Sequence, residues 1–197
     1  ATSGSHLLWD ESADDLKLVG AAGLTVAGDI SSTTAGTSNF RAGVNAGDAI
    51  QSGGNFNVVV GDEAGTAITT GDNNVGLGYA ALTATTTGTG NTGIGFSALD
   101  ANTTASDNTA VGANSLGVNT TGTRNTSVGS DSLDANTEGN DNTAVGKNAL
   151  SANTTASNNT AVGKNSLAVN TTGSDNTAVG KDAGAAVTTA IKNTLIG

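Results

Sequence analysis

Apolar and polar positions recur along most of this chain with one fixed period of 17 residues. From residue 39 onward an Asn opens each unit, an apolar residue mostly stands at its fourth position and a Gly always stands at its fifth. We number the positions of every repeat from this Asn. The first spacing is 18 residues and all later ones are 17, a regularity that predicts stacked repeats and not a disordered chain. The ten opening residues are Asn39, Asn57, Asn74, Asn91, Asn108, Asn125, Asn142, Asn159, Asn176 and Asn193.

Other positions of the repeat are restricted as well. Position 12 is mostly Asn, and positions 13 and 14 are mostly Thr. Position 5 includes Gly112, Gly129, Gly146, Gly163 and Gly180. Position 9 is Gly in the outer repeats and elsewhere Leu, namely Leu82, Leu99, Leu116, Leu133, Leu150 and Leu167. These structural repeat positions, and no catalytic, cofactor or metal residues, are the sites that the sequence predicts.

The repeat length favours an all-β parallel solenoid. A repeat of two helices needs roughly 30 residues or more, and Gly costs about 1 kcal/mol at each helical site. The Asn-Gly and Asp-Gly turns typical of antiparallel hairpins do not occur in the sequence. We therefore expect one strand at positions 1–4, a Gly corner, a second short strand around positions 8–12 and a polar turn. Stacking at about 4.8 Å per coil predicts a rod of about 43 Å.

The same pattern predicts the packing of each coil. We expect Val145, Leu150, Val162 and Leu167 to be buried, with Leu stacked on Leu in successive coils. Gly at position 5 should have a positive φ, or lie where a Cβ would strike the adjacent coil, because no other residue occurs there. Asn at position 1 should form a ladder of stacked side chains, as repeated Asn residues do in cross-β structures.

Composition adds several constraints. Only 36% of residues are hydrophobic and 3% aromatic, too few for a thick core, so we expect trimerisation to supply part of the buried surface. The net charge of −10 argues against nucleic acid as a partner. The absence of Cys excludes Cys-ligated metals, a single His leaves no obvious general base, and no apolar run is long enough to span a membrane.

The pentad Asn-Thr-Ala-Val-Gly, followed by Ser/Ala-Leu and Asn-Thr-Thr-Gly, resembles the head repeat of YadA-like trimeric autotransporter adhesins. It is even more similar to the long form of that repeat in bacteriophage tail fibres, most clearly over residues 142–180. The resemblance covers 57–197, with a degenerate coil at 39–56. It implies a left-handed parallel β-roll in a homotrimer. The adhesin repeat is shorter, so the additional residues should lie in the Asn-Thr-Thr-Gly turn.

The function implied by this resemblance is structural. We expect a trimeric fibre segment of the phage tail or capsid, located on the virion and directed toward a host receptor whose identity the sequence does not give. The alternative is an adhesin head on the bacterial cell surface. A polysaccharide-cleaving enzyme would need facing carboxylates and sugar-stacking aromatic residues. The chain has only three Glu, and Trp9 lies outside the repeats, so we do not expect an enzyme.

Residues 1–38 form a separate segment before the repeats at 39–197. Short strands are predicted at 7–10, 16–19 and 23–26, separated by turns rich in Asp, Ser and Gly. The segment is similar to shaft segments of phage fibres, in which strands from three chains interlock. Residues 31–38 are expected to link it to the solenoid.

Two charged sets leave alternatives open. Asp72, Asp107, Asp141 and Asp175 lie near the turn before the repeat Asn and either form solvated Asx-turns or bind Ca²⁺. Lys147, Lys164 and Lys181 all occupy position 6 and should form a column of like charges. That column is either a solvated edge or the partner of acidic residues on a neighbouring chain.

Overall fold

The computed structural model describes residues 6–10, 15–19 and 38–197. The chain divides into two units, Ala1–Ser31 and Ser32–Gly197, and the described residues of each unit form one sheet. The repeats all lie in the second unit. The first unit therefore corresponds to most of the N-terminal segment that the sequence sets apart.

A hairpin forms the described part of the first unit. Strands β1 (His6–Asp10) and β2 (Asp15–Val19) pair as an antiparallel two-stranded sheet, with His6 opposite Val19. These strands confirm the first two of the three predicted for this segment. The third, expected at 23–26, lies outside the described residues.

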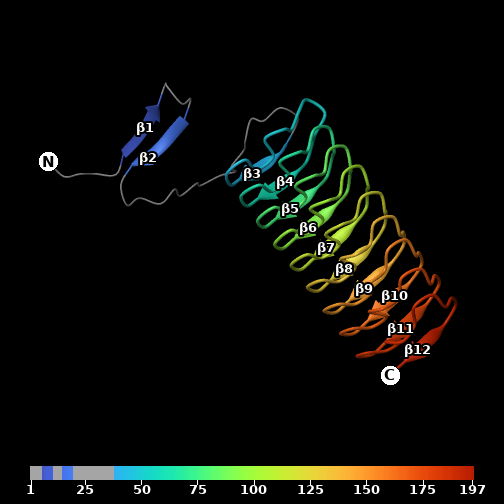
Figure 1. Ribbon diagram of the computed structural model, residues 1–197. Helices are drawn as coiled ribbons and strands as arrows, with labels where there is room; N and C mark the ends of the chain where they lie inside the picture. The colour runs from blue at the N-terminus through green and yellow to red at the C-terminus, as the bar shows by residue number, and fades with distance from the viewer. Residues whose placement is uncertain (1–5, 11–14, 20–37) are drawn as a thin grey trace. The chain divides into compact units, whose positions relative to one another are not determined.

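Ten short strands form the single parallel sheet of the second unit, in chain order (Figure 1). Each strand occupies positions 2–4 of its repeat and pairs with its neighbours without a shift in register. The described residues contain no helix. The predicted all-β solenoid of 17-residue coils is confirmed. Its strands are β3 (Phe40–Ala42), β4 (Val58–Val60), β5 (Val75–Leu77), β6 (Thr92–Ile94), β7 (Thr109–Val111), β8 (Thr126–Val128), β9 (Thr143–Val145), β10 (Thr160–Val162), β11 (Thr177–Val179) and β12 (Thr194–Ile196).

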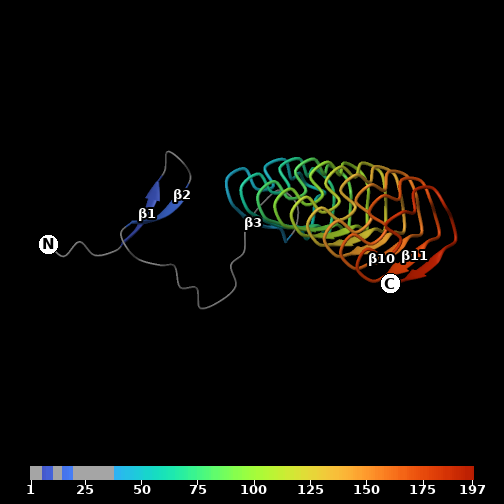
Figure 2. The same ribbon diagram turned by 60° about the horizontal axis from the view of Figure 1, so that its bottom comes forward.

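The middle residue of each strand points into its coil. Figure 2 shows the coils as stacked loops with the strands along one side. Ala144 and Ala161 at position 3 are fully buried, whereas Val145 and Val162 at position 4 are each 36% exposed. The prediction that these two valines are buried is therefore wrong. Side chains alternate across a strand, so only one residue of a three-residue strand faces inward, and it is the small one.

The predicted second strand at positions 8–12 is also wrong. In its place residues 147–152, and the equivalent residues of other coils, form a turn. Asn148 at position 7 has a φ of 57° and Leu150 at position 9 has a φ of 51°. Strands require a strongly negative φ, so the backbone bends twice here. Adjacent turns still bond to each other, as the 3.0 Å bond from the Leu150 N–H to the Ser166 carbonyl shows.

Gly at position 5 makes the corner after each strand. Its φ lies between 127° and 136° in all nine coils from Gly43 to Gly180. A Cβ on Gly146 would also lie 2.5 Å from the carbonyl oxygen of Gly163 in the next coil. Both reasons given for the Gly requirement are therefore confirmed, and any side chain here would push adjacent coils apart.

The interior is filled in two different ways. In the six central coils, from Leu82 to Leu167, the Leu of position 9 is fully buried against small residues at position 3. In the second coil Gly65 stands at position 9, and its place is taken by Val59 and Ile68. A Cβ on Gly65 would lie 2.6 Å from Val59 Cγ1 and 2.8 Å from Ile68 Cδ1. The interior volume is kept while the residues that fill it change.

The buried leucines have a costly backbone conformation. All six at position 9 have φ values between 48° and 58°. A left-handed φ costs a non-Gly residue roughly 1–2 kcal/mol, whereas full burial of Leu contributes about 1.5–3 kcal/mol. Burial therefore outweighs strain, and this explains why position 9 is either Leu or Gly in this chain.

Two substitutions of one Leu test this balance. Leu150→Ala should lower the free energy of unfolding by about 2–5 kcal/mol, because it removes buried methyl groups and keeps the strained φ. Leu150→Gly should be no more destabilising than Leu150→Ala, since Gly adopts this φ without strain. Urea unfolding followed by circular dichroism measures both. A Gly variant that is less stable than the Ala variant by about 1 kcal/mol, as in ordinary elements, would contradict the role of φ.

Candidate functional site: side-chain ladders and outer faces of the solenoid

The Asn at position 1 closes its own coil and holds the next one. In the coil that starts at Asn142, its Nδ2 donates to the Ala156 carbonyl at 2.8 Å, and its Oδ1 accepts the N–H of Asn159 at 3.0 Å. Both bonds occur at Asn39, Asn57, Asn74, Asn91, Asn108, Asn125, Asn142 and Asn176. Asn159 provides the same stacking bond to Asn176. The predicted ladder is present.

A second Asn ladder runs through position 12. Asn153 Nδ2 donates to Asn136 Oδ1 at 2.8 Å and to the Ala156 carbonyl at 3.1 Å. The two ladders therefore meet on one carbonyl oxygen, at position 15. The second ladder ends where Val187 replaces Asn, and Asn170 Oδ1 is left buried without a partner.

Two further polar columns were not predicted from the sequence. Thr154 Oγ1 at position 13 donates to the Thr171 carbonyl of the next coil at 3.2 Å. Ser157 Oγ at position 16 accepts the N–H of Asn140 at 3.0 Å. The only signal in the sequence is a run of Thr at position 13 and of small polar residues at position 16. These polar side chains bond adjacent coils to each other.

The turn aspartates have partners within the protein. Asp72 accepts the N–H of Asn55 at 2.7 Å. Arg124 donates two bonds to Asp141, at 2.7 and 2.9 Å, and these bonds lower the pKa of the Asp141 carboxyl. Asp107 also attracts the Arg124 guanidinium. Within the described ranges, no three His, Cys, Asp or Glu residues come together as metal ligands would.

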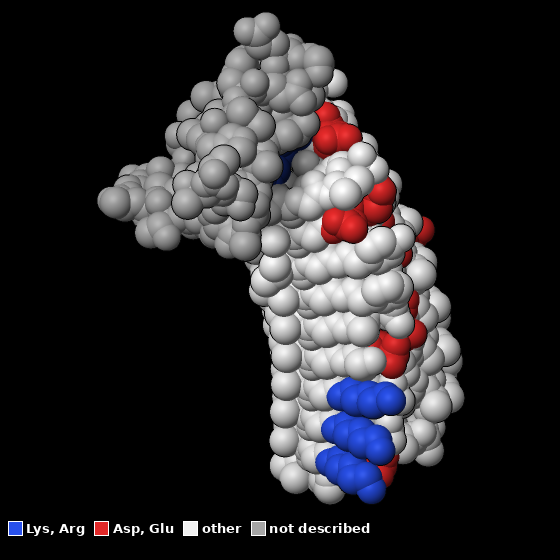
Figure 3. Space-filling model, turned by 90° about the vertical axis from the view of Figure 1, so that its left-hand side faces the viewer, with Lys and Arg blue, Asp and Glu red and all other residues white. Residues whose placement is uncertain are grey.

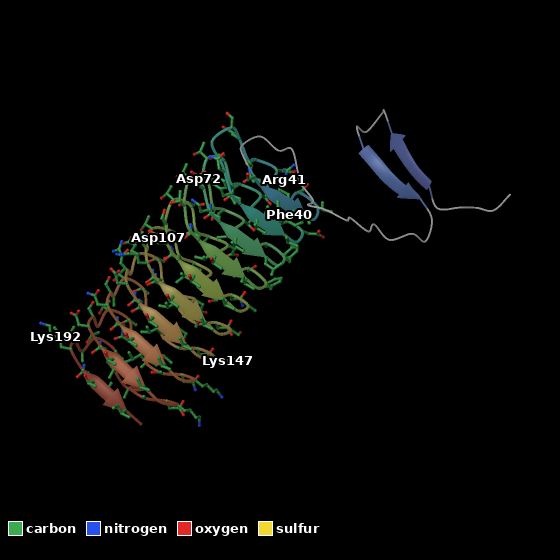
Figure 4. The ribbon with its side chains drawn as sticks, turned by 180° about the vertical axis from the view of Figure 1, so that it is seen from behind. Phe40, Arg41, Asp72, Asp107, Lys147 and Lys192 are labelled. Carbon is green, nitrogen blue, oxygen red and sulfur yellow. The ribbon has the colours of Figure 1, made fainter. Side chains whose placement is uncertain are left out.

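The charged corners lie on opposite edges of the solenoid. Asp175 accepts a bond from Asn158 Nδ2 at 3.2 Å in the same turn column. Figure 4 shows Asp107 and Lys192 along one edge and Lys147 on the other, with the strands between them. The turn aspartates therefore share one edge, where Asp107 and Asp141 both interact with Arg124.

The outer face of the sheet is uncharged and has an apolar column at position 4. Positions 2 and 4 point outward, and neither carries a charged residue in any of the ten repeats. The apolar column at position 4 is exposed at Leu77 (45%) and from Val128 (36%) to Val179 (43%), and half-buried at Ile94 and Val111 between them. Thr from Thr92 onward fills position 2 beside it. A continuous uncharged face of this kind is typical of a surface that another protein covers.

Position 6, just beyond the Gly corner, changes character along the solenoid. Tyr79 and Phe96 stack with ring centroids 5.5 Å apart. Further along the chain the same position carries Lys147, Lys164 and Lys181, which appear as a row of basic side chains in Figure 3. Because the row occupies one corner, the like-charge column expected from the sequence is present.

Two aspartates at position 10 are partly withdrawn from water. Burial raises the pKa of Asp100 and of Asp134. One oxygen of Asp134 is buried and has no hydrogen-bond partner, and the charge of Asp131 raises its pKa further. Asp134 therefore destabilises the folded state when it is ionised.

Comparison with protein-family models, curated proteins and solved structures gives no match. Across the described part of the chain, no helix has the length and apolar character that crossing a membrane requires. The arguments about function therefore depend on the geometry of the solenoid and on the repeat itself.

Removing one ladder Asn should destabilise the solenoid. Asn142→Ala leaves the N–H and Nδ2 of Asn159 without their acceptor, at a cost of about 1–3 kcal/mol for each buried donor. Thr155→Ala, at an exposed position of the same coil, should change stability by less than about 0.5 kcal/mol. Thermal unfolding of both variants measures the difference. Equal stability of the two variants would show that the ladder contributes little.

The partly buried carboxyl of Asp134 should make the stability of the solenoid depend on pH. Because the folded pKa of Asp134 is raised, the folded state binds more protons, and stability is lost as the pH rises through that pKa. Asp134→Asn should therefore raise the melting temperature at pH 7, and the gain should shrink as the pH falls below the ordinary value of 3.8. Glu138→Gln, at an exposed turn, is the control. A gain that is the same at low and neutral pH would contradict this account.

Proposed function

We propose that the solenoid is a structural segment of a trimeric bacteriophage fibre that projects from the virion toward the host surface. One observation carries the proposal: the outer face of the sheet is uncharged at positions 2 and 4 of all ten repeats, in a chain with a net charge of −10. Three strongly negative chains approach one another most easily along such a face. The resemblance of the repeat to trimeric fibres supports the same arrangement.

The interior of the coils supports a mechanical role. The buried Asn side chains and many of the Thr and Ser side chains bond adjacent coils and close each coil on itself. Each coil therefore touches only its neighbours, and repetition extends the structure in one direction. In a trimer the position-4 columns of three chains pack around a common axis. The exposed Val145 and Val162 then supply the core that each coil lacks.

Cross-linking tests the trimer directly, because the chain has no native Cys. Val162→Cys should give cross-linked chains on mild oxidation, since the three equivalent residues meet at the axis. Thr155→Cys lies on another face and should stay uncross-linked. Sedimentation equilibrium of the unmodified protein should give three times the chain mass. A folded monomer at micromolar concentration would exclude the trimer.

A charge on the proposed interface should weaken assembly. Val145→Lys with Val162→Lys places like charges around the axis and should raise the dissociation constant at least about tenfold. Thr155→Lys adds charge elsewhere and should leave it unchanged. The coding sequence on both sides separates the fibre from the adhesin head: a virion-attachment segment supports the fibre, and a membrane-anchor segment overturns it.

A further inference from the structure

A row of three lysines is the largest concentration of positive charge on the solenoid. Lys147, Lys164 and Lys181 are exposed, and the side chain of Lys181 is 71% exposed although it contacts Asp182 at 3.2 Å. Coils stack at about 4.8 Å, so the ammonium groups are held close together. Like charges in adjacent strands repel each other, and the row costs stability unless an anion offsets it.

The other basic residues differ from this row. Arg41 lies 3.9 Å from Asp48, and Arg124 binds Asp141 at 2.7 Å. Among residues 38–197, Lys147 and Lys164 make no such ion pair. Lys147 is attracted by Asp131 and Lys164 by Asp182, but both side chains are exposed and can contact an external anion.

Amide side chains run beside the lysines at position 7. Asn148 Nδ2 donates to Asn165 Oδ1 at 3.3 Å, and Asn165 Nδ2 donates to Asp182 Oδ1 at 2.8 Å. These bonds fix the amides in a line parallel to the lysine row. Each amide nitrogen carries a second N–H that is available to a hydroxyl or carboxylate oxygen.

We propose that the lysine row and the amides of Asn148 and Asn165 bind an extended acidic polysaccharide that lies along the solenoid axis. An exposed corner with repeated cations suits a linear polymer, because each of these three coils offers the same group at a spacing of about 4.8 Å. Carboxylates of the polymer pair with the ammonium groups, and its hydroxyls bond to the amides. The inference does not depend on the proposed trimer.

The charge of the whole chain favours a polysaccharide over a nucleic acid. Duplex DNA carries one charge per roughly 1.7 Å, which a protein with a net charge of −10 repels over a long range. A polysaccharide with isolated carboxylates feels less of this repulsion and offers more hydroxyls to the neighbouring amides. The binding should be weak for each site and should decrease as salt is added.

Binding of polygalacturonate, a polymer of sugar carboxylates, tests the proposal on the intact chain. We expect saturable binding at low salt by biolayer interferometry, and none of neutral dextran. Replacing all three lysines by Gln should weaken binding about tenfold. Circular dichroism should show that the triple variant folds, because the three side chains are exposed.

A matched pair of added charges separates position from net charge. Ser130→Lys extends the row by one coil and should strengthen binding to polygalacturonate about threefold. Thr155→Lys adds the same charge on another face and should have little effect. If both variants bind alike, only net charge matters and the proposed site is wrong.

The remaining outcomes also decide the question. Binding that survives loss of the three lysines would overturn the site. Tighter binding of duplex DNA or of polyglutamate than of polygalacturonate, at the same salt concentration, would overturn the choice of polysaccharide. Binding of dextran sulfate that needs the same lysines would support the site and assign recognition to charge spacing more than to the sugar.

Discussion

The amide side chain at position 1 is the interaction on which the solenoid depends. It spans 14 residues to a carbonyl of its own coil and receives the N–H of the next coil. A coil with so few large apolar side chains buries too little apolar surface to offset an unpartnered buried amide, which costs about 1–3 kcal/mol. The Asn columns therefore replace part of the hydrophobic core, and they fix both the circumference of each coil and its contact with the next.

The sequence predicts those parts of the fold that depend on residues repeating every 17 positions. The 17-residue spacing, the Gly corner and the buried Leu column follow from residues that repeat in register, and the structure confirms each of them. The outward direction of Val145 could not be predicted in this way. A strand of three residues is too short to show alternation, and a Val beside a buried Ala looks like the better core residue.

The turn at positions 6–11 shows a second limit. Leu is rare at positive φ, so residue propensities predict a strand at Leu150 and at the equivalent residues of the other coils. The only sign in the sequence that position 9 has a positive φ is that Gly replaces Leu there in three coils, at Gly47, Gly65 and Gly184. The runs of Thr at position 13 and of small polar residues at position 16 do not predict hydrogen bonds between coils, because Thr and Ser are equally common at exposed turns.

The two ways of filling the interior separate the ends of the solenoid from its middle. Coils with Gly65 or Gly184 at position 9 fit particular neighbours, whereas the six coils from Leu82 to Leu167 present nearly the same surfaces above and below. One of these central units can be gained or lost as a whole without disturbing either end. Each such change alters the length by one strand spacing, about 4.8 Å. The length of the solenoid therefore changes in steps of one coil, and duplication of 51 nucleotides is enough to add one step.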